Sequence, residues 1–86
     1  MTEIKSILKS LPNGYSEVIY MGLKYGMTVN RFNNDRSVKV YAKALSETDF
    51  ISLNFYETPT SDYFKPCEMP MGKVIHFLRN YKIIEE

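Results

Sequence analysis

Residues 49–56 read Asp-Phe-Ile-Ser-Leu-Asn-Phe-Tyr, and this stretch alternates apolar with mostly polar side chains in the period-2 pattern of a half-buried β-strand. Its apolar face consists of Ile51, Leu53 and Phe55. Its reverse face mixes polar and aromatic side chains and consists of Phe50, Ser52, Asn54 and Tyr56. We therefore expect a sheet with one apolar face, and the other segments of the chain should either pair with this strand or cover that face.

Four other segments have the composition or the alternation of strands, namely residues 16–20, 23–32, 37–45 and 63–65. The first two are joined by Met21 and Gly22, and a glycine suits a tight hairpin turn. Residues 33–36 read Asn-Asn-Asp-Arg and predict a turn without glycine, because asparagine tolerates the left-handed backbone region better than most residues. Pro66 suits an edge strand, which need not donate every N–H group.

Two segments have the periodicity of amphipathic helices. Residues 3–11 carry apolar side chains at i, i+3, i+4 and i+7, which are Ile4, Ile7, Leu8 and Leu11. Residues 70–81 begin with a proline and repeat the spacing with Val74, Phe77, Leu78 and Tyr81. Each helix therefore has one apolar stripe to bury.

The order of these elements predicts an α+β fold. Strands follow one another without intervening helices, so an antiparallel meander of four or five strands is expected rather than a parallel sheet. The N-terminal and C-terminal helices should pack side by side on the apolar face, giving a two-layer domain. At 86 residues the chain is expected to form a single domain spanning residues 1–86.

Composition limits the classes of function. Lysine and arginine number 11 against 10 aspartates and glutamates, a net charge of +1, whereas proteins that bind nucleic acid through phosphates usually have a clear basic excess. One cysteine excludes an intramolecular disulfide. The N-terminus lacks the apolar core of a signal peptide, and no apolar run is long enough to span a bilayer. We expect a cytoplasmic protein that does not associate with membranes.

Cys67 is the first candidate site, because it lies three residues before the start of the second predicted helix and a helix N-terminus stabilises a thiolate. His76 lies nine residues further on, about 14 Å along a helix axis, so a cysteine–histidine pair is not expected. One histidine and one cysteine also fall short of the ligand set of a metal site. No phosphate-binding or nucleophile-elbow glycine pattern occurs, and we expect no metal and no cofactor.

The reverse face of the predicted sheet is the second candidate. If residues 37–45 pair with residues 49–56, one surface carries Lys39, Tyr41, Lys43, Ser52, Asn54 and Tyr56, with Lys24, Thr28 and Asn30 as possible additions. Aromatic side chains among lysine and asparagine are suited to a peptide or a single nucleic-acid strand, through stacking and hydrogen bonding. The alternative is an ordinary solvated sheet face, since these residues also pack well across strands.

The sequence also resembles a group of small bacterial proteins that carries no established activity. The resemblance runs from Gly14 to Leu78 and rests on Arg-Ser-Val-Lys-Val-Tyr-Ala at 36–42, Asp-Phe-Ile-Ser-Leu-Asn-Phe-Tyr at 49–56 and Lys-Pro-Cys-Glu-Met-Pro at 65–70. Such proteins are sometimes labelled peptide methionine sulfoxide reductases, which implies a thiol-dependent activity at Cys67. The Gly-Cys-Phe-Trp motif of that enzyme class is absent here, and the chain has no tryptophan.

These observations predict a non-enzymatic binding module that uses the reverse face of the sheet. Its partner is expected to be a protein or peptide, or a second copy of the chain, rather than nucleic acid. The alternative is a thiol-dependent redox activity at Cys67.

Overall fold

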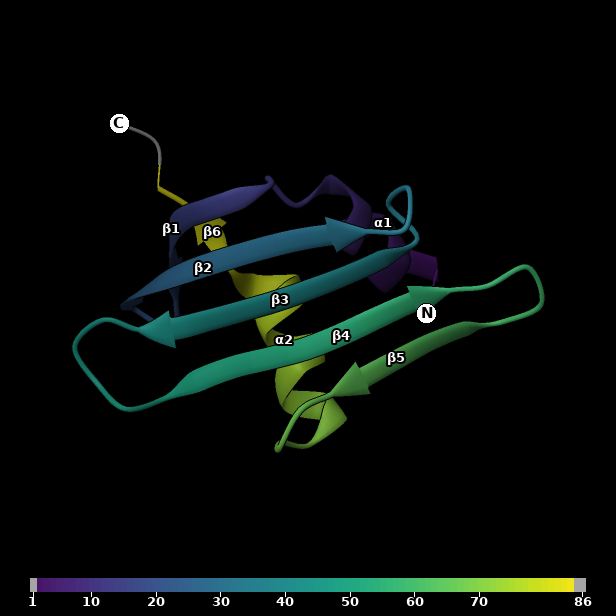
Figure 1. The fold of residues 1–86 in the computed structure, drawn as a ribbon. Helices are drawn as coiled ribbons and strands as arrows, with labels where there is room; N and C mark the ends of the chain where they lie inside the picture. Colours follow the sequence, from purple (N-terminus) through teal and green to yellow (C-terminus); the bar gives the residue numbers. More distant parts are fainter. Residues whose placement is uncertain (1, 85–86) are drawn as a thin grey trace.

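The computed structural model describes residues 2–84 as a sheet with two helices behind it (Figure 1). The helices are α1 (Thr2–Ser10) and α2 (Met71–Asn80). The strands are β1 (Gly14–Tyr20), β2 (Leu23–Phe32), β3 (Ser37–Ala44), β4 (Phe50–Glu57), β5 (Asp62–Pro66) and β6 (Lys82–Ile83). The strand predicted at residues 49–56 is β4, which begins and ends one residue later than predicted.

The sheet is open and antiparallel, with the strand order β5-β4-β3-β2-β1-β6. This confirms an α+β fold with an antiparallel sheet and two helices, but the prediction of four or five strands is wrong, because the sheet has six. The extra strand, β6, follows α2 and pairs with the outer edge of β1, where Val18 lies opposite Ile83. Two residues are too few for alternation to be recognised in a sequence.

Left-handed turn residues fix the two hairpins that begin the sheet. Met21 and Gly22 have φ of 54° and 77°, as required at the two central positions of a type I′ turn. Asn33, Asn34 and Asp35 have φ between 55° and 68°, so the turn without glycine uses three consecutive left-handed residues. Both turns lie where the sequence predicted them.

The core lies between the helices and one face of the sheet. Both helices are behind the sheet in Figure 1, and α1 and α2 contact each other. The helices contribute Ile4, Leu8, Val74, Phe77 and Leu78, and the sheet contributes alternate residues of four strands, among them Val18, Met27, Val29, Val40, Ile51 and Leu53. Burial of this apolar surface is the main force that holds the two layers together.

Arg31 joins β2 to the C-terminal end of α1. It lies on the helix side of β2 and donates from Nη2 to the carbonyl oxygens of Leu8 at 2.8 Å and Leu11 at 3.0 Å. Its Nη1 donates to the side chain of Asn13. These carbonyls have no partner within the helix, and a cation is favoured at that end of the helix dipole. This role of Arg31 was not predicted from the sequence, although Arg31 continues the inward register of Met27 and Val29.

Candidate binding surface

The open sheet face is the side of the sheet turned away from both helices (Figure 1). Strand register places all six predicted residues on it: Lys39 lies opposite Asn54, Tyr41 opposite Ser52, Lys43 opposite Phe50, and Tyr56 opposite Ser37. The neighbouring strand adds Thr28 opposite Tyr41 and Asn30 opposite Lys39. The pairing that the sequence analysis assumed is therefore present.

Exposure differs among these residues. Tyr41 and Tyr56 are 41% and 40% exposed, which is high for aromatic side chains within strands. Ser52 is buried and belongs to the floor of the surface rather than to its contact groups. Phe50 is half-buried, and its ring stacks on that of Tyr41 with centroids 6.1 Å apart. The surface thus has an aromatic pair beside a polar floor.

A shallow hollow of about 660 Å³ lies in the middle of the open sheet face. Its lining comes from β2, β3 and β4 and includes Thr28, Lys39, Tyr41 and Asn54, together with Cys67 and Glu68 beyond β5. Hydroxyl, amide, ammonium and aromatic groups all face this space, and that mixture suits recognition of a polar segment with some apolar side chains.

Cys67 belongs to the same surface. Its backbone N–H donates to the carbonyl of Ser52 at 2.9 Å, which continues the ladder between β4 and β5 for one more residue. Asn54 donates from Nδ2 to the half-buried Sγ at 3.2 Å. Cys67 and the reverse face of the sheet, separate candidates in the sequence, therefore lie together in the structure. The i, i+2, i+4 spacing of Tyr63, Lys65 and Cys67 was the signal that could have revealed this.

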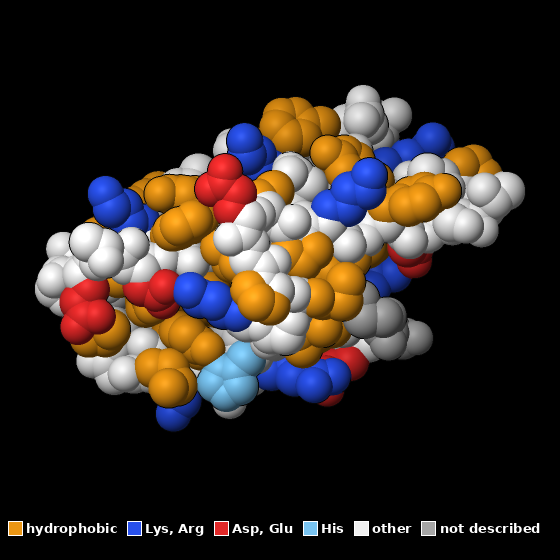
Figure 2. Space-filling model, turned by 90° about the horizontal axis from the view of Figure 1, so that it is seen from below, with side chains coloured by type: hydrophobic (Ala, Val, Ile, Leu, Met, Phe, Trp, Pro, Cys, Tyr) orange, Lys and Arg blue, Asp and Glu red, His pale blue; other side chains and the backbone are white. Residues whose placement is uncertain are grey.

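His76 lies on the other side of the sheet from Cys67, in the helix layer. Its Nδ1 shares a hydrogen bond of 2.5 Å with the hydroxyl of Tyr20, which is buried. The exposed imidazole, pale blue in Figure 2, lies at the surface among hydrophobic and basic side chains. The structure therefore does not form a cysteine–histidine pair.

A polar cluster outside the open sheet face links α2 to the residue that precedes β4. Asp49 accepts hydrogen bonds from Lys73 Nζ at 2.5 Å and from the hydroxyl of Tyr25 at 2.8 Å. The hydrogen bond from Lys73 lowers the pKa of Asp49, and the one from Tyr25 lowers it further. Burial, followed by the contact with Asp49, raises the pKa of Tyr25. All three side chains have partners, so this cluster is best understood as a link between the layers.

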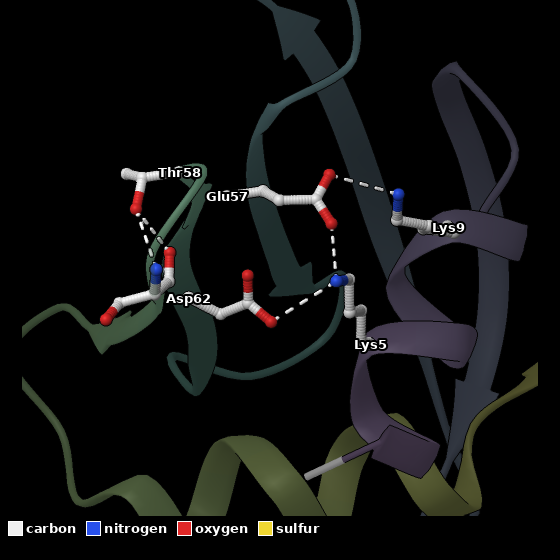
Figure 3. A network of polar contacts seen from close by, with 6 residues as sticks. Lys5, Lys9, Glu57, Thr58 and Asp62 are labelled. Atoms are coloured by element: carbon white, nitrogen blue, oxygen red, sulfur yellow. Dashed lines mark hydrogen bonds and ion pairs between the residues drawn. The ribbon is translucent and has the colours of Figure 1, made fainter.

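A network of ion pairs joins α1 to the hairpin between β4 and β5 (Figure 3). Lys5 bridges Glu57 and Asp62, and Lys9 reaches Glu57 Oε1 at 3.2 Å. Hydrogen bonds from Lys5 and Lys9 lower the pKa of Glu57. A hollow of about 570 Å³ lies beside this network, but Lys5, Glu57 and Asp62 satisfy one another there.

Two further features of residues 2–84 bear on function. No helix in this range is long and apolar enough to cross a membrane. Within the same range, histidine, cysteine, aspartate and glutamate side chains do not gather in a group of three or more that could hold a metal ion.

Comparison of the chain with protein-family models, curated proteins and solved structures found no match.

Proposed function

We propose that this protein is a cytoplasmic, non-enzymatic binding module that holds a segment of a protein or peptide on its open sheet face. One observation carries the proposal. The sheet is covered by helices on one face, whereas the other face has a hollow bordered by Tyr41 with Phe50 stacked on it. Exposed aromatic groups around a concavity are typical of interaction sites.

The polar groups of the hollow favour binding over catalysis. Asn54 and Ser52 are hydrogen-bonding groups with little acid–base chemistry of their own at neutral pH. A general base or nucleophile needs a partner within hydrogen-bonding reach. Cys67 has polar contacts with Asn54 and, weakly at 3.9 Å, with the carbonyl oxygen of Lys65. Neither contact supplies a base.

A thiol-dependent activity at Cys67 is the second candidate function. It is favoured by the position of the half-buried sulfur on the wall of the hollow, where a bound molecule would contact it. The two functions make different demands on the sulfur. A redox activity requires the thiol itself, whereas a binding surface requires only a side chain of similar size.

Photo-crosslinking in an extract of the cell that makes the protein tests the proposed function. A benzophenone side chain replaces Tyr41 on the open sheet face, and a matched variant carries it at Ser6, which is exposed on α1. We expect a discrete crosslinked partner from position 41 that is absent from position 6. Equal capture at both positions, or capture at neither, would contradict the proposal.

A further inference from the structure

The charges of the open sheet face are unevenly paired. The face carries five lysines and two glutamates, which are Lys24, Lys39, Lys43, Lys65, Lys82, Glu17 and Glu68. Lys24 lies 3.8 Å from Glu17 and is neutralised there. The other four lysines are exposed, and none of the ion pairs within residues 2–84 includes them. Lys39 and Lys43 on β3 and Lys65 on β5 lie at and beside the hollow, whereas Lys82 lies on β6 at the opposite edge of the sheet.

Among the described residues elsewhere, most carboxylates pair with basic groups of the helices, and Asp35 and Glu47 are the exceptions. Glu57 pairs with Lys5 and Lys9, Asp49 with Lys73, and Glu3 with Arg79. The net charge of +1 therefore hides a local excess of positive charge. That excess lies around the hollow, where it favours approach of a negatively charged partner.

The unpaired lysines stand in register with hydrogen-bonding groups. Lys39 lies opposite Asn54 on β4, and Asn54 lies opposite Lys65 on β5. Adjacent strands are about 4.8 Å apart, so the two lysines are about 10 Å from each other. Side chains on one face of an extended peptide recur every two residues, about 6.6 Å apart, so flexible lysine side chains on the two strands can reach carboxylates at that spacing. The stacked rings of Tyr41 and Phe50 lie beside this row.

We infer that the segment held on the open sheet face is acidic, with carboxylates that pair with Lys39, Lys43 and Lys65 and an apolar side chain that packs on the rings of Tyr41 and Phe50. The inference rests on the proposed function and names the chemistry of its partner. Its physical basis is complementarity of charge, which gives specificity and speed of association more than raw affinity.

Two other occupants fit the face less well. A second copy of the chain, placed face to face about a two-fold axis, would bring unpaired lysines against unpaired lysines, and like charges oppose such contact. A nucleic-acid strand would meet four lysines outside ion pairs, with the like charge of Glu68 in the hollow. These are few beside the roughly 6–10 phosphate contacts of a protein that binds DNA tightly.

The inference is tested with synthetic peptides about eight residues long, which span about 26 Å when extended. One repeats Leu-Leu-Glu-Glu, so that each face of the extended peptide carries both residue types, and its matched control has glutamine in place of every glutamate. A thymidine oligonucleotide of about the same length is the nucleic-acid arm. Binding is measured by NMR shifts of Lys39, Tyr41 and Asn54, and by protection of Cys67, the only thiol, from alkylation.

We expect the glutamate peptide to shift these residues and protect Cys67, with at least tenfold higher affinity than the glutamine peptide, about the effect of two to three exposed ion pairs. That preference should shrink between about 0.01 M and about 0.15 M salt, as the Debye length falls from about 30 Å to about 8 Å. Replacing these three lysines (Lys39→Gln, Lys43→Gln, Lys65→Gln) should remove the preference, whereas Lys9→Gln on α1, on the other side of the sheet, should leave it.

Four results would overturn the inference. Equal binding of both peptides would show a face that binds without regard to charge, which leaves the proposed function standing. Tighter binding of the oligonucleotide on the same residues would assign the face to nucleic acid. Shifts that appear on raising protein concentration alone would assign it to a second copy. Absence of any peptide shift would exclude an acidic segment, and the Tyr41 crosslinking result then decides the proposed function separately.

Discussion

Asn54 donates a hydrogen bond to the sulfur of Cys67 at 3.2 Å, and this contact joins the centre of β4 to the residue that follows β5. The cysteine is thereby held on the open sheet face rather than turned toward the helix. Substitution of Cys67 therefore distinguishes the two candidate functions. A residue that only contacts a partner can be replaced by a group of similar size, whereas a redox activity requires the thiol itself.

Replacement of the sulfur by a hydroxyl is the first prediction. Cys67→Ser keeps an acceptor for the Asn54 amide, so we expect unchanged folding and a change of affinity for the crosslinked partner of no more than about threefold, the scale of a small surface change. The measurement is the dissociation constant of wild type and variant side by side. Complete loss of partner binding, with the fold retained, would favour a role that needs the thiol itself.

The second prediction concerns the contact between Arg31 and α1. Arg31→Gln removes charged hydrogen bonds to the carbonyls of Leu8 and Leu11 and should lower the free energy of unfolding by about 1–3 kcal/mol. Urea denaturation measures the change. Arg36→Gln, in an exposed turn, is the matched control and should stay within about 0.5 kcal/mol of wild type. Equal effects of the two substitutions would show that Arg31 does not cap the helix.

The hairpin between β1 and β2 supplies the third prediction. Met21 has φ of 54° without being glycine or asparagine, and Gly22 follows it with φ of 77°. Met21→Asn restores the preferred Asn-Gly pair of a type I′ turn and should stabilise the protein by about 0.5–1 kcal/mol. Gly22→Ala should destabilise it, because alanine is strained at that φ. Thermal unfolding compares the two variants, and a destabilising Met21→Asn would contradict the assigned turn.

The fourth prediction is a loss of stability in alkali. Burial raises the pKa of Tyr25 above its ordinary value of 10.0, so the folded protein holds the phenol proton more tightly than the unfolded chain does. The stability that this supplies is complete below pH 10.0 and is lost as pH rises from there. Urea midpoints between about pH 9 and about pH 11.5 should fall in wild type and fall less in Tyr25→Phe. Parallel curves for the two proteins would contradict a raised pKa at Tyr25.

Alternation made the two faces of the sheet predictable. Val38, Val40, Ile51 and Leu53 face the helices as their period-2 spacing requires, and the lysines and tyrosines between them face outward. The helices were predictable for the same reason, since Ile4, Leu8, Val74, Phe77 and Leu78 are buried at helical spacing. The spacing of apolar residues along one element indicates which of its side chains face the core, and it depends only on residues close together in the sequence.

Contacts between distant segments were not predictable. The pairing of Cys67 with the β4 strand depends on the register of the β4–β5 hairpin, whose loop contains Pro59 and has no diagnostic turn pair. The binding of Arg31 to α1 depends on where the helix ends in space. Pairing of Lys82 with Ile19 depends on the path of the chain after α2. Each is set by tertiary packing, which single-sequence periodicity does not encode.

The most direct test of the central claim is the affinity of the crosslinked segment for a protein that lacks two of the exposed tyrosines of the open sheet face, Tyr41 and Tyr56. Tyr41→Ser combined with Tyr56→Ser removes the aromatic contacts and should weaken binding at least tenfold, about the loss expected for central aromatic contacts. Met21→Ser, in an exposed turn, is the control and should bind as wild type does. Equal affinity of the double variant and wild type, with both folded, would contradict binding through the open sheet face.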